Sequence, residues 1–221
     1  MKSPPDRGEE EGNVRNRLLT AFCIVYVLFT AVAANGESNL AGQVLVEINL
    51  ARTNPTAYVG FLRQFRTQFQ GKNYRQPGSP VLIQTTEGVR AVDEAIRVLS
   101  RQKPMQPLSW SDGLAAAAAE LVEDEGESGE TGHVGRTSGS PQERIERHGK
   151  WQGRIGESIG YGPDKARAMV MQLIVDDAVP DRGHRKSILT PAFRTAGVAC
   201  GPHSRYGTIC TIDFAAGFRD R

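Results

Sequence analysis

Residues 165–189 read KARAMVMQLIVDDAVPDRGHRKSIL, and this stretch combines an apolar helix pattern with a histidine close behind it. The pattern predicts an amphipathic helix over 165–177, with Asp164 as its N-cap. At about 100° per residue, Asp177 falls in the middle of the apolar stripe and Asp176 at its edge. Such a carboxylate either emerges into solvent at the helix end or points into a polar cavity. The stripe consists of Ala166, Met169, Val170, Leu173 and Ile174.

Candidate partners for this carboxylate are two histidines and a glutamate. His184 follows the helix in a basic segment, and is either a surface histidine or part of a working site. His133 and Glu157 each lie beside glycines, which give the backbone room to approach another element. His148 and His203 lie in polar, turn-like segments, so we expect them at the surface.

The rest of the chain predicts helices first and a small sheet last. The segment 71–87 is rich in turn formers and predicts an exposed loop, whereas 155–162 fits a short strand or a turn. The runs 195–201 and 207–218 predict a β-hairpin. This order is typical of an α+β or layered α/β/α fold. Helical periodicity covers 40–53, 55–69, 88–101 and 113–125.

An uncharged leader precedes this domain. Residues 18–34 follow two arginines and end in small residues, as a secretory signal does. An uncleaved signal anchor is the alternative, for two reasons. The segment before the apolar run is long and of mixed charge, and the run itself is only slightly short of the ~20 residues of a spanning helix. We predict a tail and signal peptide (or anchor) over 1–34 and one domain over 35–221. The protein is then secreted, or a single-pass membrane protein if the leader is retained.

Cysteine and charge content narrow the choice of cellular compartment and of binding partners. Cys23 lies in the leader, so the mature chain keeps Cys200 and Cys210. These two residues either form one disulfide across the predicted hairpin, in an oxidising compartment, or stay reduced and buried. The formal net charge of +2 gives no global field that would recruit nucleic acid. We therefore expect no nucleic-acid partner, and a membrane partner only through an uncleaved leader.

The order of these segments resembles the CAP superfamily of cysteine-rich secretory, antigen-five and pathogenesis-related proteins, also called SCP-like extracellular proteins. The resemblance covers roughly residues 40–218. Its most specific parts are IGESIGYG at 155–162, similar to the Gly-Glu-Asn-hydrophobic motif, and RGHRKSIL at 182–189, similar to a motif of the bacterial-type branch. The resemblance implies an α+β fold, a three-layer α-β-α sandwich with a small antiparallel sheet.

The resemblance also implies a central cleft with two histidines and two acids. His133 and His184 are similar to the histidines, and Glu157 to the first acid. The segment QLIVDD is similar to Gln-Leu-Trp-Val-x-Glu, which makes Asp177 the second acid, as the helical wheel also does. Asp176 is the alternative, because the insertion AVPDR loosens the alignment. Aspartate in place of the usual glutamate shortens the reach by one methylene.

Three functions follow from these residues. The resemblance implies a secreted, non-catalytic binding module for a sterol or fatty acid. Its four polar residues form either a hydrogen-bonded cluster or a site for zinc or another divalent metal, with His133 and His184 as ligands. A metal-dependent hydrolase with Glu157 or Asp177 as general base is the alternative, although HExxH and Gly-x-Ser-x-Gly motifs are missing from the sequence. A protein-interaction module with 71–87 as its contact surface is the third.

Overall fold

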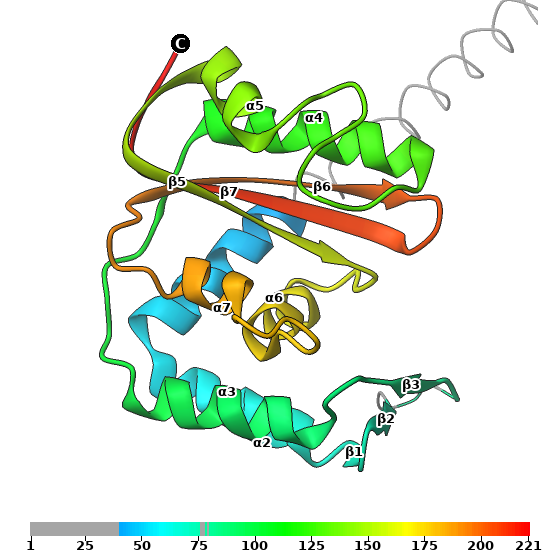
Figure 1. Ribbon diagram of the computed structural model, residues 1–221. Coiled ribbons are helices and arrows are strands. Elements are labelled where there is room, and N and C mark those ends of the chain that lie inside the picture. Colours follow the sequence, from blue (N-terminus) through cyan, green and yellow to red (C-terminus); the bar gives the residue numbers. More distant parts are fainter. Residues whose placement is uncertain (1–39, 76–77, 79) are drawn as a thin grey trace, which may run out of the picture. The chain divides into compact units, whose positions relative to one another are not determined.

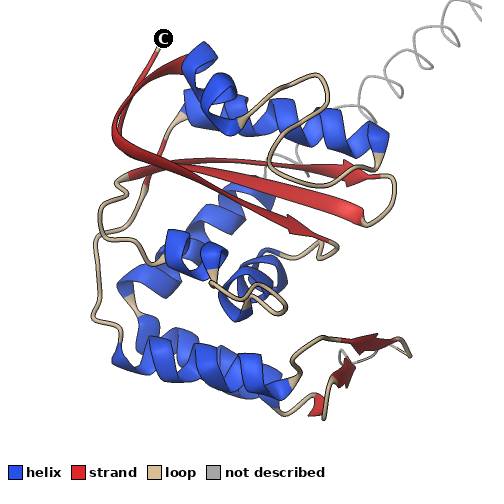
Figure 2. Ribbon diagram, viewed as in Figure 1, coloured by secondary structure: helices blue, strands red, loops and turns tan. Residues whose placement is uncertain are grey.

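A four-stranded sheet lies between two groups of helices (Figures 1 and 2). The strand order is β4-β6-β7-β5; β4 pairs with β6 in parallel, and the other two pairs are antiparallel. The predicted C-terminal hairpin is the pair β6 and β7. The strands are β4 (Ser109–Trp110), β5 (Gly149–Tyr161), β6 (Thr195–His203) and β7 (Gly207–Asp220).

The structure is a computed structural model that describes residues 40–75, 78 and 80–221, and Leu40–Arg221 form one compact unit. The predicted leader, 1–34, lies outside the described residues. Within the described part of the chain, no helix is both long and apolar enough to span a membrane.

Helices cover both faces of the sheet and make the predicted sandwich. Helices α4 and α5 lie on one face, and α6 and α7 contact β5 from the other, with α2 and α3 farther from the sheet (Figure 1). Residues 40–53 are also helical. The remaining helices are α2 (Pro55–Arg66), α3 (Val89–Arg101), α4 (Asp112–Ser128), α5 (Pro141–His148), α6 (Ala166–Val175) and α7 (Gly183–Ile188).

The alternation of β7 explains why the sheet has two apolar faces. Cys210, Ile212 and Phe214 belong to the large core shared with α2, α3 and α6. Ile209 and Ala215 point the other way, into two smaller clusters with residues of α4 and α5. Because side chains alternate along a strand, β7 supplies apolar side chains to the cores on both faces of the sheet. Each polar side chain of β7 likewise faces one helical layer or the other.

Helix α4 begins with a side-chain cap, whereas α6 differs from its prediction at both ends: it starts at Ala166, and Lys165 instead of Asp164 is its N-cap. The Ser111 side chain accepts from the Leu114 N–H at 3.1 Å and starts α4. In contrast, α6 ends at Val175, two residues before the predicted end, because Asp176 adopts a left-handed backbone with φ 57° and ψ 45°. Every side-chain direction extrapolated beyond Val175 on an ideal wheel is therefore wrong.

The segment predicted as a loop at 71–87 instead contains two short strands of a second sheet. Strands β1 (Phe69–Gln70), β2 (Asn73–Arg75) and β3 (Leu82–Gln84) pair in antiparallel order. The rings of Phe65, Phe69 and Tyr74 contact one another beside them, with centroids about 5 Å apart. This aromatic cluster supplies the apolar contact that the turn-forming composition did not indicate.

Two close approaches fix the C-terminal hairpin. Cys200 and Cys210 are direct partners across β6 and β7 and form the predicted disulfide. Gly197 lies so close to α4 that a Cβ there would come within 1.9 Å of the Ala115 nitrogen. Only a glycine allows the helix to pack this tightly on β6.

Candidate functional site

His133 and Glu157 form the first of two histidine–carboxylate pairs. Glu157 lies in the middle of β5, and its Oε1 accepts from His133 Nδ1 at 2.7 Å. The glutamate side chain is 2% exposed, whereas the histidine side chain is 53% exposed. The hydrogen bond to Glu157 raises the pKa of His133 above its ordinary value. A buried carboxylate therefore holds an imidazole that reaches solvent.

Arg144 fixes both members of this pair, and the sequence did not indicate it as a site residue. Its side chain, on α5, is fully buried. Nη2 donates to Glu157 Oε2 at 2.5 Å, and both terminal nitrogens lie 3.3 Å from the His133 carbonyl oxygen that accepts from them. Nη1 also donates to the Gly139 carbonyl. The only sequence feature that could have pointed to Arg144 is its position next to the apolar Ile145 in a short helix.

A tyrosine and a second glutamate anchor the loop before His133. The Gly132 N–H donates to the Tyr161 hydroxyl at 3.1 Å, and that hydroxyl donates to Glu125 Oε2 at 2.6 Å. Burial raises the pKa values of both Tyr161 and Glu125. Tyr161 ends β5, so the strand that carries Glu157 also holds the loop that carries His133.

His184 and Asp176 form the second pair. His184 Nδ1 lies 2.7 Å from Asp176 Oδ1, and the other carboxylate oxygen accepts from the backbone N–H groups of His184 and Arg185. The Asp176 side chain is 1% exposed and that of His184 is 22% exposed. The acid satisfies two N–H groups in the first turn of α7, which have no partner within the helix.

The choice of Asp177 as the second acid is corrected by this geometry. Its two oxygens accept from the Thr86 and Glu87 N–H groups at 2.7 and 2.8 Å, in the turn before α3. The wheel placed Asp177 inward because it continued α6 past Val175. The left-handed turn at Asp176 directs the first carboxylate to His184 and the second away from it.

The arginines beside His184 are structural. Arg185 is buried and donates to the Ile174 and Val175 carbonyls and to Glu94. Arg182 donates to both Glu87 and Glu94. These contacts join the segment between α6 and α7 to α3 and hold His184 in place.

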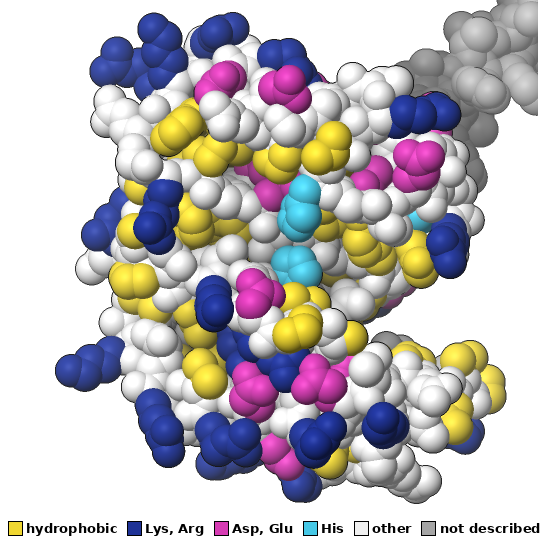
Figure 3. All heavy atoms as spheres, viewed as in Figure 1, with side chains coloured by type: hydrophobic (Ala, Val, Ile, Leu, Met, Phe, Trp, Pro, Cys, Tyr) yellow, Lys and Arg dark blue, Asp and Glu magenta, His cyan; other side chains and the backbone are white. Residues whose placement is uncertain are grey.

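Both imidazoles are therefore held in the same way. Each uses Nδ1 toward an acceptor, and within the described residues neither Nε2 atom has a hydrogen-bond partner. Histidine side chains lie one above the other near the middle of the face shown in Figure 3. A carboxylate behind Nδ1 fixes ring orientation and tautomer and raises the basicity of Nε2, which is the arrangement found behind metal-bound histidines.

The two carboxylates are already engaged, which leaves the two imidazoles as the candidate metal donors of the two pairs. Both oxygens of Glu157 and both oxygens of Asp176 are engaged in hydrogen bonds. Among the residues that the structure describes, no three His, Cys, Asp or Glu side chains are arranged to hold an ion together. The Nε2 atoms of His133 and His184 are the atoms that would bind a metal, with water completing its coordination.

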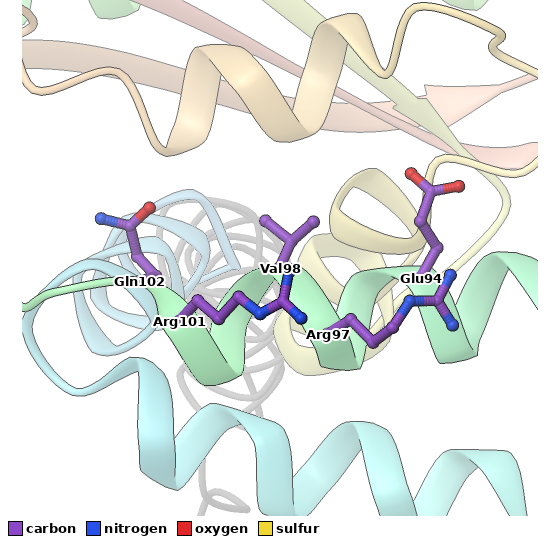
Figure 4. A pocket seen from close by; sticks show the side chains of 5 residues that line it. All are labelled: Glu94, Arg97, Val98, Arg101 and Gln102. Carbon is purple, nitrogen blue, oxygen red and sulfur yellow. The ribbon is translucent and has the colours of Figure 1, made fainter.

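A pocket of about 370 Å³ lies along α3, and no residue of the two histidine pairs lines it (Figure 4). Its lining is polar and charged apart from Val98; the other residues are Glu94, Arg97, Arg101 and Gln102. Ligand sites for apolar molecules are lined mostly by apolar side chains. This pocket therefore does not suit a sterol or a fatty acid.

The remaining histidines differ from each other. His148 is part-exposed and pairs with Glu120 at 2.6 Å. His203 is buried, contrary to the surface position predicted for it, and its ring bonds the Glu130 carbonyl and the backbone N–H groups of the following turn. The turn-like composition around His203 did not indicate that its ring contacts the ring of Tyr161.

Comparison with known proteins identifies the family. The protein-family model with the description "CAP: Cysteine-rich secretory protein family" matches residues 49–214, which is more than half of the chain. The chain belongs to the CAP family. No curated protein matches this CAP chain.

Solved structures similar to this CAP chain come from bacteria. One is an extracellular protein containing a SCP domain from Bacillus anthracis, with 19% identity and a TM-score of 0.41, covering 57% of this chain and 37% of that one. Another is an outer surface protein from Borrelia burgdorferi, with 17% identity and a TM-score of 0.43; the match covers 50% of this chain and 78% of that one. A third, a cysteine-rich secretory protein from Staphylococcus aureus, has 14% identity and a TM-score of 0.39, covering 58% and 38%. The CAP chain thus spans less than two thirds of the Bacillus and Staphylococcus proteins.

Proposed function

We propose that this CAP chain is an extracellular, non-catalytic binding module whose His133 and His184 bind a divalent metal such as zinc. The observation that carries the proposal is the matched pairing of each Nδ1 with a buried carboxylate at 2.7 Å. This pairing leaves both Nε2 atoms available in the described part of the chain. Zinc commonly binds neutral imidazole nitrogen, and a carboxylate behind the ring strengthens that bond.

The same contacts favour binding over catalysis. A general base needs a free lone pair within hydrogen-bond reach of a substrate or water. Glu157 is held by His133 and Arg144, and Asp176 is held by His184 and the first turn of α7. Asp177 caps a backbone turn instead of facing either histidine. A hydrolase that uses Glu157 as its base would have to rely on a side chain that is 2% exposed and already accepts from His133 and Arg144.

A sterol or fatty-acid ligand stays a prediction from the resemblance. The pocket along α3 offers such a ligand one apolar side chain, Val98, among polar and charged residues. Extracellular placement is supported by the family and by the disulfide between Cys200 and Cys210, which is typical of oxidising compartments.

Zinc titration by calorimetry on the full chain tests the metal site. We expect the wild type to bind one zinc ion per chain, and His133→Ala and His184→Ala each to weaken binding at least about tenfold, the scale on which even outer-shell partners act. His148→Ala is the matched control, because His148 pairs with Glu120. Equal affinity in all four proteins would contradict the proposal, and so would a wild type that binds no zinc, which would make the two pairs structural clusters.

A further inference from the structure

Asp213 is a fully buried acid at the centre of the sheet, next to the His133 half of the site. It lies on β7, where its direct partners are Glu157 on β5 and Gly197 on β6. Neither of its carboxylate oxygens receives a hydrogen bond from any donor in the described chain. A buried, ionised carboxylate without donors is strongly destabilising, so this residue needs an explanation.

Asp213 and Glu157 are direct partners across the antiparallel pair of β7 and β5, so their side chains lie on the same face of the sheet with Cβ atoms about 4.5–5.5 Å apart. Two carboxylate groups are both acceptors when ionised, so they form a hydrogen bond only when one of them carries a proton. Glu157 already accepts from His133 and Arg144, which stabilise its ionised form. The proton therefore belongs on Asp213, which has no other donor to stabilise a charge.

The charged groups that face Asp213 agree with this assignment. They are Glu157 from β5 and Arg144 from α5; β6 contributes only Gly197 opposite it. Burial raises the pKa of Asp213 well above its usual range, the negative charge of Glu157 raises it further, and Arg144 lowers it. Burial and the neighbouring carboxylate therefore both favour the neutral form of Asp213.

We propose that Asp213 is a positioning residue of the His133 site: it is protonated in the folded protein and donates a hydrogen bond to Glu157. Glu157 is then held from three sides, by a histidine, an arginine and a carboxylic acid. Its position and that of the His133 ring are set from inside the sheet. Asp176 has a different support, because backbone N–H groups hold its second oxygen. The consequence for metal affinity rests on the function proposed above, whereas the protonation does not.

Infrared spectroscopy of the full chain with isotope-labelled aspartate tests the protonation directly. We expect a shifted carbonyl band of a protonated aspartic acid at neutral pH in the wild type and in His133→Ala. It should be lost in Asp213→Asn and retained in Asp164→Asn, a control whose side chain is 74% exposed. A wild-type spectrum without this band, or a band that persists in Asp213→Asn, would overturn the inference. The label separates Asp213 from the buried Glu125.

Zinc calorimetry then tests the positioning role. Asp213→Asn keeps a neutral donor toward Glu157 and should bind zinc within about twofold of the wild type, whereas Asp213→Leu removes the donor and should bind about tenfold more weakly. Equal affinity in a folded Asp213→Leu variant would overturn the role. If that variant does not fold, a loss of affinity in Asp213→Asn as large as that in His133→Ala would overturn it instead. A wild type that binds no zinc refutes the metal function alone, because the infrared band still decides where the proton lies.

Discussion

Asp176 and Asp177 are adjacent in the chain, yet their carboxylates bind different parts of the molecule. Asp176 accepts from the ring and backbone of His184, whereas Asp177 accepts from two N–H groups in the turn before α3. The left-handed backbone at Asp176 separates them. One of these acids supports the candidate metal site, and the other supports the fold.

Replacing the two acids in turn separates these roles. Asp176→Asn should weaken zinc binding about 10- to 100-fold, the range typical of a lost partner behind a metal-bound histidine. Asp177→Asn should leave the affinity within about twofold, since the hydrogen-bond partners of Asp177 are backbone N–H groups before α3 and not an imidazole. Calorimetry of both variants measures the difference. A larger loss in Asp177→Asn would restore Asp177 as the second acid.

Arg144 should be among the most sensitive positions for stability. Removing one partner of a buried ion pair leaves the other charge uncompensated, so Arg144→Ala should lower the free energy of unfolding by about 3–5 kcal/mol. Arg147→Ala is the control on the same helix: its side chain is 45% exposed, and its pair with Glu120 should contribute under about 1 kcal/mol. Urea denaturation of both variants measures the two losses of unfolding free energy. Losses of similar size would refute the special role of Arg144.

The ion pairs of Arg182 with Glu87, just before α3, and with Glu94, in α3, predict an acid-sensitive fold. Hydrogen bonds from Arg182 lower the pKa values of Glu87 and Glu94 to about 2 from the ordinary 4.5. Because the folded pKa is depressed, the stabilisation is fully present above about pH 4.5 and is lost as the pH falls toward 2. Both side chains are partly exposed, which screens the effect.

Unfolding free energies measured by urea denaturation across this pH range test the prediction. Glu87→Gln/Glu94→Gln should be less stable than the wild type at neutral pH and should show a shallower decline between about pH 4.5 and 2. Glu127→Gln is the control, since Glu127 is exposed and has no ion pair within the described residues. A decline in the double variant as steep as that of the wild type would assign the acid sensitivity to other groups.

The disulfide should stabilise the hairpin moderately. Cys200 and Cys210 are 10 residues apart, and closing so short a loop contributes about 3 kcal/mol in the chain-entropy model. Cys200→Ala/Cys210→Ala should therefore unfold at lower urea than the oxidised wild type. Reducing agent should lower the stability of the wild type and leave the variant unchanged. Equal stability of the oxidised and reduced wild type would contradict the prediction.

The fold was largely predictable because its signals are local. Apolar periodicity located the helices apart from α5 and α7, and the two C-terminal runs indicated the hairpin. The pairing of Cys200 with Cys210 followed from that hairpin. The strands at 73–75 and 82–84 were missed, because their apolar contacts come from Phe65 and Phe69, outside the segment that was interpreted as a loop.

The site was predictable only in part because it is assembled from distant segments. His133, Glu157 and His184 stand out beside glycines or in a motif, but nothing local shows that Arg144 and Asp213 both meet Glu157. These contacts depend on how α5 and β7 pack against β5. The error at Asp177 has a different cause, namely that the end of a helix changes the direction of every residue after it.

The left-handed turn at Asp176 also limits which amino acids evolution can place there. Aspartate and asparagine adopt φ near 57° far more readily than most other residues with side chains. A glutamate at 176 would strain the backbone and move its carboxylate one methylene too far. In homologues that keep this turn and the histidine–carboxylate pair, position 176 should therefore be aspartate, and glutamate should accompany a longer α6.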